Sequence, residues 1–230
     1  MFKATLAFVT LTALVAVPAQ ALRSRKAAAE ATAPADSAAL GAYTPVNYDL
    51  TQDRENILVL DLSNGQRVHI RLMPQWAPEH VARVKQLASQ GFYNNVVFHR
   101  VIDGFMAQTG DPTGTGQGGS SLPDLKAEFN PQPHLRGTVS MARAASDDSA
   151  NSQFFIVFYP RFSLDRKYTV FGRVIDNMAA VDAIQRGEPP QNPTRIVQAS
   201  LASENKPAPP VAPQPAQTIT ADDLNSPIGQ

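Results

Sequence analysis

The sequence predicts a mainly β fold, a closed eight-stranded antiparallel β-barrel capped by two α-helices. Three observations support this prediction: eight short segments have strand character, strands and helices do not alternate regularly, and two further segments are amphipathic helices. Neighbouring strands without intervening helices pair antiparallel, and closing the sheet removes its exposed edges. Because 43% of the 230 residues are hydrophobic, the chain can bury a substantial core.

The first two predicted strands form a hairpin. Ile57–Leu62 and Gln66–Leu72 flank a turn that contains Asn64-Gly65, and Asn-Gly favours such turns because both residues accept positive φ. In the second strand three aliphatic residues alternate with two arginines and a histidine. This alternation predicts one buried face and one face in water, and Arg71 falls on the wet face.

Six further segments are strand candidates. The predicted strands are Val96–Arg100, Phe105–Gln108, Thr138–Met141, Phe154–Phe158, Val170–Ile175 and Arg195–Leu201.

Two segments have the apolar spacing of amphipathic helices. Pro78–Ser89 has proline in its first turn and Gly91 just beyond its end. Asn177–Gln185 has Asn177 as a plausible N-cap and Gly187 beyond its end. We expect these helices to close the two ends of the barrel.

Residues 1–21 have the three-part pattern of a secretory signal peptide. Lys3 precedes an almost wholly apolar run, residues 4–17, and Ala19-Gln20-Ala21 forms a small-residue cleavage site. The run is shorter than the ~20 residues that span a bilayer. We therefore expect cleavage after Ala21, export and no stable membrane insertion afterwards; the alternative is an uncleaved membrane anchor.

The remaining flanks lack any sustained apolar period. Residues 22–45 contain nine alanines and predict a flexible spacer, and residues 202–230 contain six prolines and predict a disordered tail. The tail could dock to a partner or remain solvated. The folded domain is predicted to span residues 46–201.

Composition and spacing exclude several functions. The chain has 20 basic and 20 acidic residues, so it lacks the basic surface that nucleic-acid binding needs. The absence of cysteine excludes disulfides and thiolate chemistry, and the four histidines lack metal-ligand spacing. Gly114–Gly119 matches G-x-G-x-x-G, but Pro123 prevents the helix that a dinucleotide site requires. We interpret it as a surface loop whose glycines adopt positive φ.

The most informative segment is Phe98–Asp111, FHRVIDGFMAQTGD. Arg100 lies within a predicted strand, and Phe-Met-x-Gln follows within eight residues. Antiparallel pairing would bring these side chains together around one site. Taken alone, a strand arginine beside aromatic residues is also typical of a stacked surface residue.

This segment resembles the core signature of the cyclophilins, the peptidyl-prolyl cis-trans isomerases. Four further blocks resemble the family in the same order: Gly114–Gly119, Gly137–Ala142, Ser152–Ile156 and Tyr168–Val174. The match covers about residues 53–201. It implies an eight-stranded barrel with two helices, in agreement with the strand count, and it implies isomerase activity without a metal or a cofactor.

The resemblance assigns roles to nine residues. Arg100 matches the catalytic arginine, and Gln108 matches a residue that binds peptide backbone and orients that arginine. The other matching positions line the proline pocket or its edge: Phe105, Met106, Ala142, Arg143, Phe155, Leu164 and Tyr168.

Two positions depart from the family pattern. Arg143 replaces a frequent asparagine, which could shift the peptide preference. The frequent tryptophan that helps bind cyclosporin corresponds to Ser163, or to Phe162 if the loop slips by one residue. We therefore expect weak cyclosporin binding.

The expected activity is acceleration of X-Pro bond rotation in peptides and in unfolded or folding exported proteins. The bacterial periplasm is the expected compartment, and we expect a monomer. Two alternatives remain open: a proline-peptide adaptor or holdase without catalysis, and a barrel that carries small apolar ligands. A lumen filled by large side chains would argue against the carrier.

Overall fold

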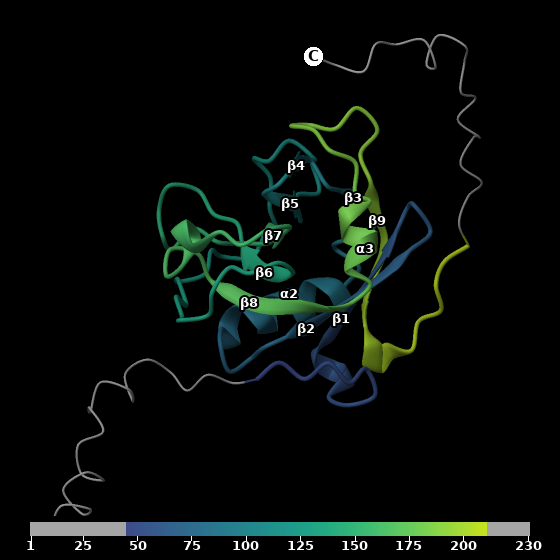
Figure 1. The fold of residues 1–230 in the computed structure, drawn as a ribbon, viewed down its shortest axis with the longest axis horizontal. Coiled ribbons are helices and arrows are strands. Elements are labelled where there is room, and N and C mark those ends of the chain that lie inside the picture. Colours follow the sequence, from purple (N-terminus) through teal and green to yellow (C-terminus); the bar gives the residue numbers. More distant parts are fainter. Residues whose placement is uncertain (1–44, 211–230) are drawn as a thin grey trace, which may run out of the picture. The chain divides into compact units, whose positions relative to one another are not determined.

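The computed structural model describes residues 45–210, in which nine strands form one curled antiparallel sheet (Figure 1). The order across the sheet is β3-β9-β1-β2-β8-β6-β7-β5-β4. The strands are β1 (Ile57–Leu62), β2 (Arg67–Leu72), β3 (Val96–Val97), β4 (Arg100–Ile102), β5 (Met106–Thr109), β6 (Thr138–Met141), β7 (Phe154–Val157), β8 (Val170–Asp176) and β9 (Arg195–Leu201). The helices are α2 (Pro78–Ser89) and α3 (Met178–Asp182), and short 3₁₀ turns are η2 (Arg54–Asn56), η3 (Phe162–Leu164) and η4 (Ala202–Glu204).

The mainly β class is confirmed, but the strand count and the closure differ from the prediction. The predicted strand Val96–Arg100 is divided into β3 and β4, because Phe98 and His99 are both buried and break the alternation of a strand. β3 and β4 then become the two ends of the strand order, and no ladder joins them within residues 45–210. The sheet is therefore curled rather than closed by continuous strand pairing.

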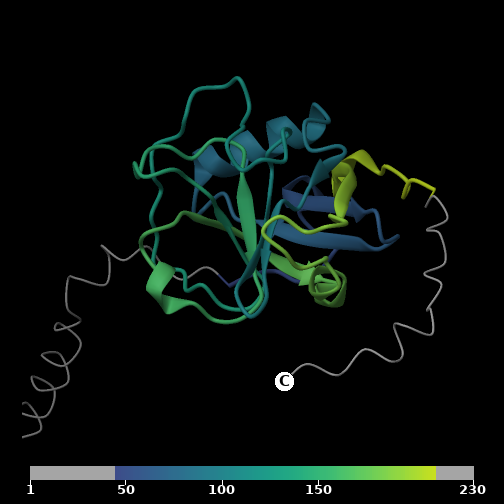
Figure 2. The same ribbon diagram turned by 90° about the horizontal axis from the view of Figure 1, so that it is seen from above.

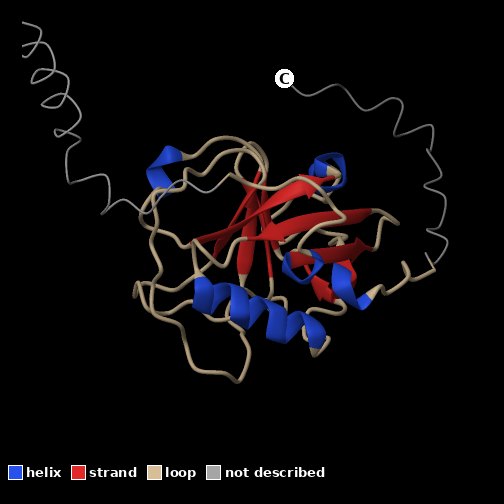
Figure 3. Cartoon of the chain, turned by 90° about the horizontal axis from the view of Figure 1, so that it is seen from below, coloured by secondary structure: helices blue, strands red, loops and turns tan. Residues whose placement is uncertain are grey.

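The two helices lie at opposite ends of the curled sheet (Figures 2 and 3). Helix α2 has the predicted bounds and buries its apolar face, which includes Val81 and Val84. The backbone N–H groups of Glu79 and His80 in its first turn each donate to the Glu128 carboxylate at 3.1 Å. A carboxylate from another segment therefore satisfies donors that a helix leaves unpaired at its start.

Helix α3 is shorter than the predicted segment Asn177–Gln185. The predicted N-cap is confirmed, because the Asn177 side chain accepts a hydrogen bond from the Ala180 N–H at 3.3 Å. The helix ends at Asp182, and the chain then turns so that Gly187 exchanges two backbone hydrogen bonds with Val101 of β4. This tertiary contact, rather than the local sequence, sets the end of the helix.

Large apolar side chains fill the interior of the sheet. Phe98, Phe154, Phe171 and Leu58 are each completely buried there. Side chains that fill the inside of a small curled sheet in this way occupy the volume that a carried ligand would need. The packing argues against the ligand-carrier alternative.

Arg71 corrects the prediction that its face of β2 lies in water. Only 1% of this residue is exposed, and its guanidinium donates to the backbone carbonyls of Asn47, Asp49, Gln52 and Asp53 at 2.6–3.1 Å. The segment before β1 folds over the outer face of the strand and covers it. Arg71 thereby ties this segment to the sheet.

Residues beyond Leu201, the predicted end of the folded domain, contact the sheet and α2. In η4, the Glu204 carboxylate accepts a hydrogen bond from Ser89 of α2 at 2.7 Å. The carbonyls of Lys206 and Pro207 accept from Arg67 and Gln198 at 3.2 and 3.1 Å. The ordered contacts of the domain therefore continue through Pro207. The predicted signal peptide and nearly all of the spacer lie outside the described residues, as does the tail beyond residue 210.

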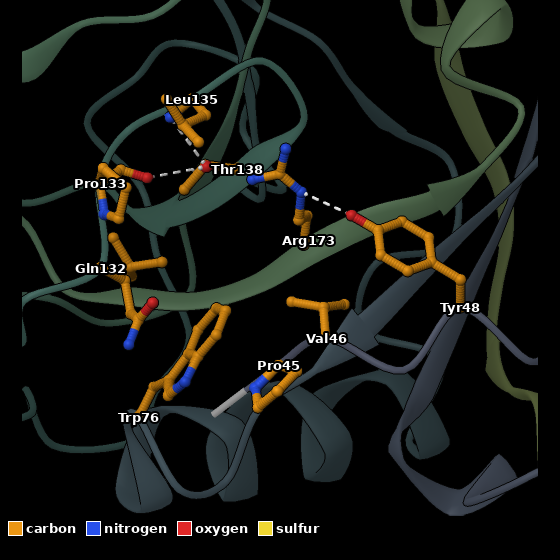
Figure 4. A pocket seen from close by; sticks show the side chains of 10 residues that line it. Pro45, Val46, Tyr48, Trp76, Gln132, Pro133, Leu135, Thr138 and Arg173 are labelled. Atoms are coloured by element: carbon orange, nitrogen blue, oxygen red, sulfur yellow. Dashed lines mark hydrogen bonds between the residues drawn. The ribbon is translucent and has the colours of Figure 1, made fainter. Parts of the chain in front are cut away.

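A pocket of about 240 Å³ lies where the N-terminal segment meets β6 and β8 (Figure 4). Its lining includes Pro45, Trp76 and Gln132, and the Arg173 Nε donates to the Tyr48 hydroxyl at 3.1 Å. None of the nine predicted site residues borders this pocket. Among residues 45–210, no helix has the length and apolarity needed to cross a bilayer.

Replacing Arg71 with methionine should lower the free energy of unfolding by about 2–4 kcal/mol, because four buried hydrogen bonds to carbonyls are lost. It should also open residues 47–53 to proteases. Chemical denaturation and limited proteolysis measure the two effects. Arg195→Met, at an exposed position of β9, is the matched control and should change stability by less than about 0.5 kcal/mol. Equal stability of the two variants would contradict the conclusion that the Arg71 hydrogen bonds hold residues 47–53 on the sheet.

Candidate active site

A pocket of about 150 Å³ opens on the outer face of the sheet, on the side formed by β4, β5, β6 and β7. The structure gathers all nine residues that the sequence singled out around this one pocket. They are Arg100, Phe105, Met106, Gln108, Ala142, Arg143, Phe155, Leu164 and Tyr168. Because they come from segments between residues 100 and 168, the fold, rather than local sequence, assembles the site.

Strand register explains why these side chains meet. Arg100 of β4 pairs with Gln108 of β5, and Gln108 pairs in turn with Phe155 of β7. Directly paired residues point to the same face of a sheet. Their neighbours Val101, Ala107 and Ile156 point to the opposite face and belong to the main core. The alternation of each strand thus gives one row to the interior and the next row to the pocket.

The floor of the pocket is apolar. Met106 is 2% exposed and Phe155 is 5% exposed, and both belong to a second apolar cluster, separate from the main core. The Phe155 ring meets the Tyr168 ring edge-on, with centroids 5.7 Å apart. The partly buried Phe105 and Leu164 pack against this cluster. The result is a small slot, walled by aromatic and aliphatic groups, that suits a compact apolar ring.

Arg100 lies at the rim of the slot. Its side chain is 43% exposed, and its Nε donates to the Glu188 carboxylate at 2.7 Å. No residue in the described range 45–210 accepts a hydrogen bond from its Nη1 or Nη2. The guanidinium is therefore anchored at one nitrogen and retains free donors beside the apolar floor.

Gln108 is held by a chain of polar contacts that ends in the glycine-rich loop. Its Nε2 donates to Gln153 Oε1 at 2.9 Å, and Gln153 Nε2 donates to the carbonyls of Gly116 and Gly118 at 3.1 and 2.8 Å. The predicted positive φ is confirmed at Gly114 and Gly116. The loop therefore orients the amide that stands next to Arg100.

The loop itself folds around a buried carboxylate. Asp111 is 0% exposed and accepts backbone N–H groups from Thr113, Gly116 and Gly118 at 2.6–3.1 Å. Burial acts to raise the pKa of Asp111, but these hydrogen bonds and that of the Thr113 hydroxyl outweigh it and lower the pKa to about 2. A Cβ at Gly118 would overlap the Asp111 carboxylate, which explains glycine there.

Arg143 forms the far rim of the pocket. Its guanidinium lies 4.8 Å from the centroid of the Tyr168 ring, and its Nη2 pairs with the exposed Asp147 at 2.9 Å. A second, more polar pocket of about 480 Å³ continues from this rim along the glycine-rich loop and shares Gln108, Ala142 and Arg143 with the slot. The apolar slot therefore has a polar extension that could receive the backbone of a longer ligand.

Comparison with known proteins identifies this arrangement. The family model described as cyclophilin type peptidyl-prolyl cis-trans isomerase/CLD matches residues 57–201. The chain belongs to the cyclophilin family. It is an enzyme of the peptidyl-prolyl cis-trans isomerase class, whose members act on proline-containing peptides.

Curated relatives and solved structures agree with this membership. A probable peptidyl-prolyl cis-trans isomerase of Brucella suis is 45% identical over 170 residues, which cover 67% of this chain and 86% of that protein. Peptidyl-prolyl cis-trans isomerase B of Bacillus subtilis is 41% identical over 128 residues, or 55% of this chain and 89% of that protein. The crystal structure of cyclophilin AquaCyp293 from Hirschia baltica matches with a TM-score of 0.61 at 29% identity, over 67% of this chain and 77% of that chain.

Three residues around the cyclophilin pocket were not among the predicted site residues. Gln153 could have been found, because it lies two residues before Phe155 and so shares its face of the strand. Arg161, whose guanidinium lies 5.0 Å from the centroid of the Phe105 ring, lies in a loop without a motif. Glu188 is 88 residues from its partner Arg100, and no sequence pattern links them. The alternative tryptophan counterparts, Phe162 and Ser163, are both exposed, and neither lines the slot.

A buried histidine supports the floor from below. The His134 ring stacks on Phe155, with centroids 6.2 Å apart, and hydrogen-bonds Asp165 at 2.8 Å and Ser140 at 2.9 Å. Burial lowers the pKa of His134 below its ordinary 6.5, although Asp165 acts in the opposite direction. Burial likewise lowers the pKa of His80 and of His99.

These depressed pKa values predict how stability depends on pH. The free energy of unfolding should have its full value above about pH 6.5 and should fall below it, because the unfolded chain then binds protons that the folded chain excludes. Each histidine contributes at most about 1.4 kcal/mol per pH unit, and its contribution levels off below its folded pKa. Urea unfolding in steps between about pH 8 and pH 5 measures this dependence.

Replacing His99 is the most direct test of this pH dependence. Neither of its ring nitrogens has a hydrogen-bond partner within the described part of the chain, and the residue is 6% exposed. His99→Phe removes one titrating group and should make the pH dependence shallower. Stability that rises on acidification from pH 6.5 would contradict the assignment of these histidines as buried and neutral.

Proposed function

We propose that Arg100 accelerates X-Pro rotation by donating a hydrogen bond to the prolyl nitrogen of a twisted imide, while the apolar slot holds the proline ring. The main support for this proposal is the position of Arg100. Its Nη donors, which bond no residue in the range 45–210, lie at the edge of a slot whose floor is Met106 and Phe155. A donor and a ring-binding surface are thus side by side on one face of the sheet.

The physical chemistry of the bond explains why this arrangement suffices. Partial double-bond character gives the planar imide a rotation barrier of ~18–20 kcal/mol. In the twisted state the prolyl nitrogen regains its lone pair and becomes a better acceptor. A donor that binds the twisted state more strongly than the planar state lowers the barrier, and each 1.36 kcal/mol is about tenfold in rate.

Proline-containing peptides are the ligands that the shape of the slot favours. A cyclophilin of Cryptosporidium parvum, 28% identical, was crystallised in the presence of the dipeptide Ala-Pro. In our proposal Gln108 binds the peptide backbone beside Arg100, and the polar pocket along the glycine-rich loop receives residues that flank the proline. No proton transfer takes part in this mechanism.

Arg100→Ala should lower kcat/KM for a short proline peptide by more than about tenfold, because the donor to the twisted imide is lost. A protease-coupled assay or NMR exchange measures the rate. Arg100→Lys should restore little activity, since a point charge on a flexible stem does not reproduce the planar guanidinium.

Arg195→Ala is the control for loss of a surface arginine and should retain activity. Thermal unfolding establishes that the Arg100 variants keep their fold. Unchanged turnover in Arg100→Ala would reject the proposed role of the arginine. Peptide binding without turnover in the wild-type chain would favour the adaptor or holdase instead.

We further propose that the protein is exported, acts as a monomer in the periplasm and assists folding proteins there. The charged start, the short apolar run and the small residues up to Ala21 support export. Expression of the full chain in a Gram-negative host should yield periplasmic protein whose first residue is Leu22, as read by N-terminal sequencing. Mature protein that retains Met1 would contradict cleavage.

A further inference from the structure

The loop between α3 and β9 places a carboxylate directly against Arg100. Glu188 Oε2 accepts the Nε–H of Arg100 at 2.7 Å, and the two side chains are 50% and 43% exposed. Glu188 is not part of the slot itself. The contact therefore holds the arginine through a residue that does not line the slot.

The loop is built to hold Glu188 in this place. Gly187 donates to the Val101 carbonyl at 2.9 Å and accepts from the Val101 N–H at 2.8 Å, so the loop is hydrogen-bonded to β4 one residue from Arg100. Gly187 has a φ of +144°, and a Cβ there would lie 2.5 Å from the Pro190 Cα. Only glycine accepts this conformation without strain.

A second anchor lies on the other side of Gly187. The Arg186 Nε pairs with Asp103 at 3.1 Å, and its guanidinium lies 4.2 Å from the centroid of the Phe158 ring. Asp103 follows β4 directly. The loop is thus tied to β4 and the turn after it by an ion pair, a backbone bridge and the Glu188–Arg100 pair.

The bond to Nε has a specific consequence for the guanidinium. The group is planar, so holding Nε–H at Glu188 narrows the range of directions that the four N–H bonds on Nη1 and Nη2 can take. Arginine otherwise has many rotamers, and an untethered side chain at the rim would spend less time directed at the slot. A carboxylate at Nε leaves the terminal nitrogens free for a ligand.

We propose that Glu188 is a positioning residue that orients Arg100 for catalysis through the Nε hydrogen bond. This inference rests on the proposed role of Arg100. The opposite effect is equally testable: a carboxylate that competed with the substrate for the guanidinium would slow turnover, and its removal would raise the rate.

Kinetics of Glu188 variants of the full chain separate these effects. Glu188→Ala should lower kcat about two- to fivefold, the range expected for one half-exposed ion pair, with KM nearly unchanged because the slot is intact. Glu188→Gln keeps an acceptor for Nε–H and should retain most of the activity. Glu204→Ala is the matched control, because Glu204 of η4 forms an ion pair of the same length, 2.7 Å, with Lys206. This variant should not change turnover.

A double variant tests whether Glu188 acts through Arg100. In the Arg100→Ala background, Glu188→Ala should cause no further loss. NMR of the Arg100 Nε–H group provides a structural readout: its proton should exchange slowly in the wild type and in Glu188→Gln, and rapidly in Glu188→Ala. Thermal unfolding should be unchanged in all Glu188 variants.

Four results would overturn the positioning role. They are full or increased activity of Glu188→Ala, equal loss in Glu188→Ala and Glu188→Gln, an equal loss in the Arg100→Ala background, and unchanged Nε–H exchange. If Arg100→Ala itself turned over normally, the proposed function would fail. If Arg100→Ala were inactive while Glu188→Ala was normal, only the present inference would fail.

Discussion

The antiparallel register of β4, β5, β7 and β6 is the constraint on which the rest of the structure depends. Side chains alternate between the two faces of a strand. Val101, Ala107 and Ile156 therefore pack into the interior, and the residues that alternate with them along the strands form the slot on the outer face. A shift of one residue in any of these pairings would exchange the two sets on that strand. Core packing and site geometry are therefore fixed by the same hydrogen-bonded ladder.

Strands and loops make different contributions to the site. The strands supply the apolar floor, because a sheet face holds side chains at fixed spacing, whereas the loops supply the polar groups at the rim. Asp111 organises one loop through its backbone N–H groups, and Gly187 allows the other to approach β4. The first loop accepts hydrogen bonds from Gln153, which contacts Gln108, and the second loop carries Glu188, which contacts Arg100. The rim is thus held by backbone conformations that favour glycine.

The sequence was sufficient for the parts that depend on local pattern. It predicted the bounds of α2 and the β1–β2 hairpin, because these follow from periodicity and turn residues. The residues that border the slot were singled out by the resemblance to a family, which rests on ordered motifs rather than on local pattern. The sequence could not predict contacts made across the fold. Arg71 looked exposed because its strand alternates, and the segment that covers it carries no strand or helix pattern of its own. The break at Phe98-His99 and the pairing of Glu188 with Arg100 likewise depend on tertiary contacts.

The buried histidine beneath the slot separates the chemistry of the site from its stability. His134 supports Phe155 while neutral, and burial keeps its pKa below the ordinary value. The proposed catalysis moves no proton, so acid should act on the enzyme by weakening the fold beneath the floor rather than by titrating the group that binds the imide. A mechanism based on hydrogen bonding to a twisted bond can thus tolerate changes in pH up to the point at which the supporting core begins to fail.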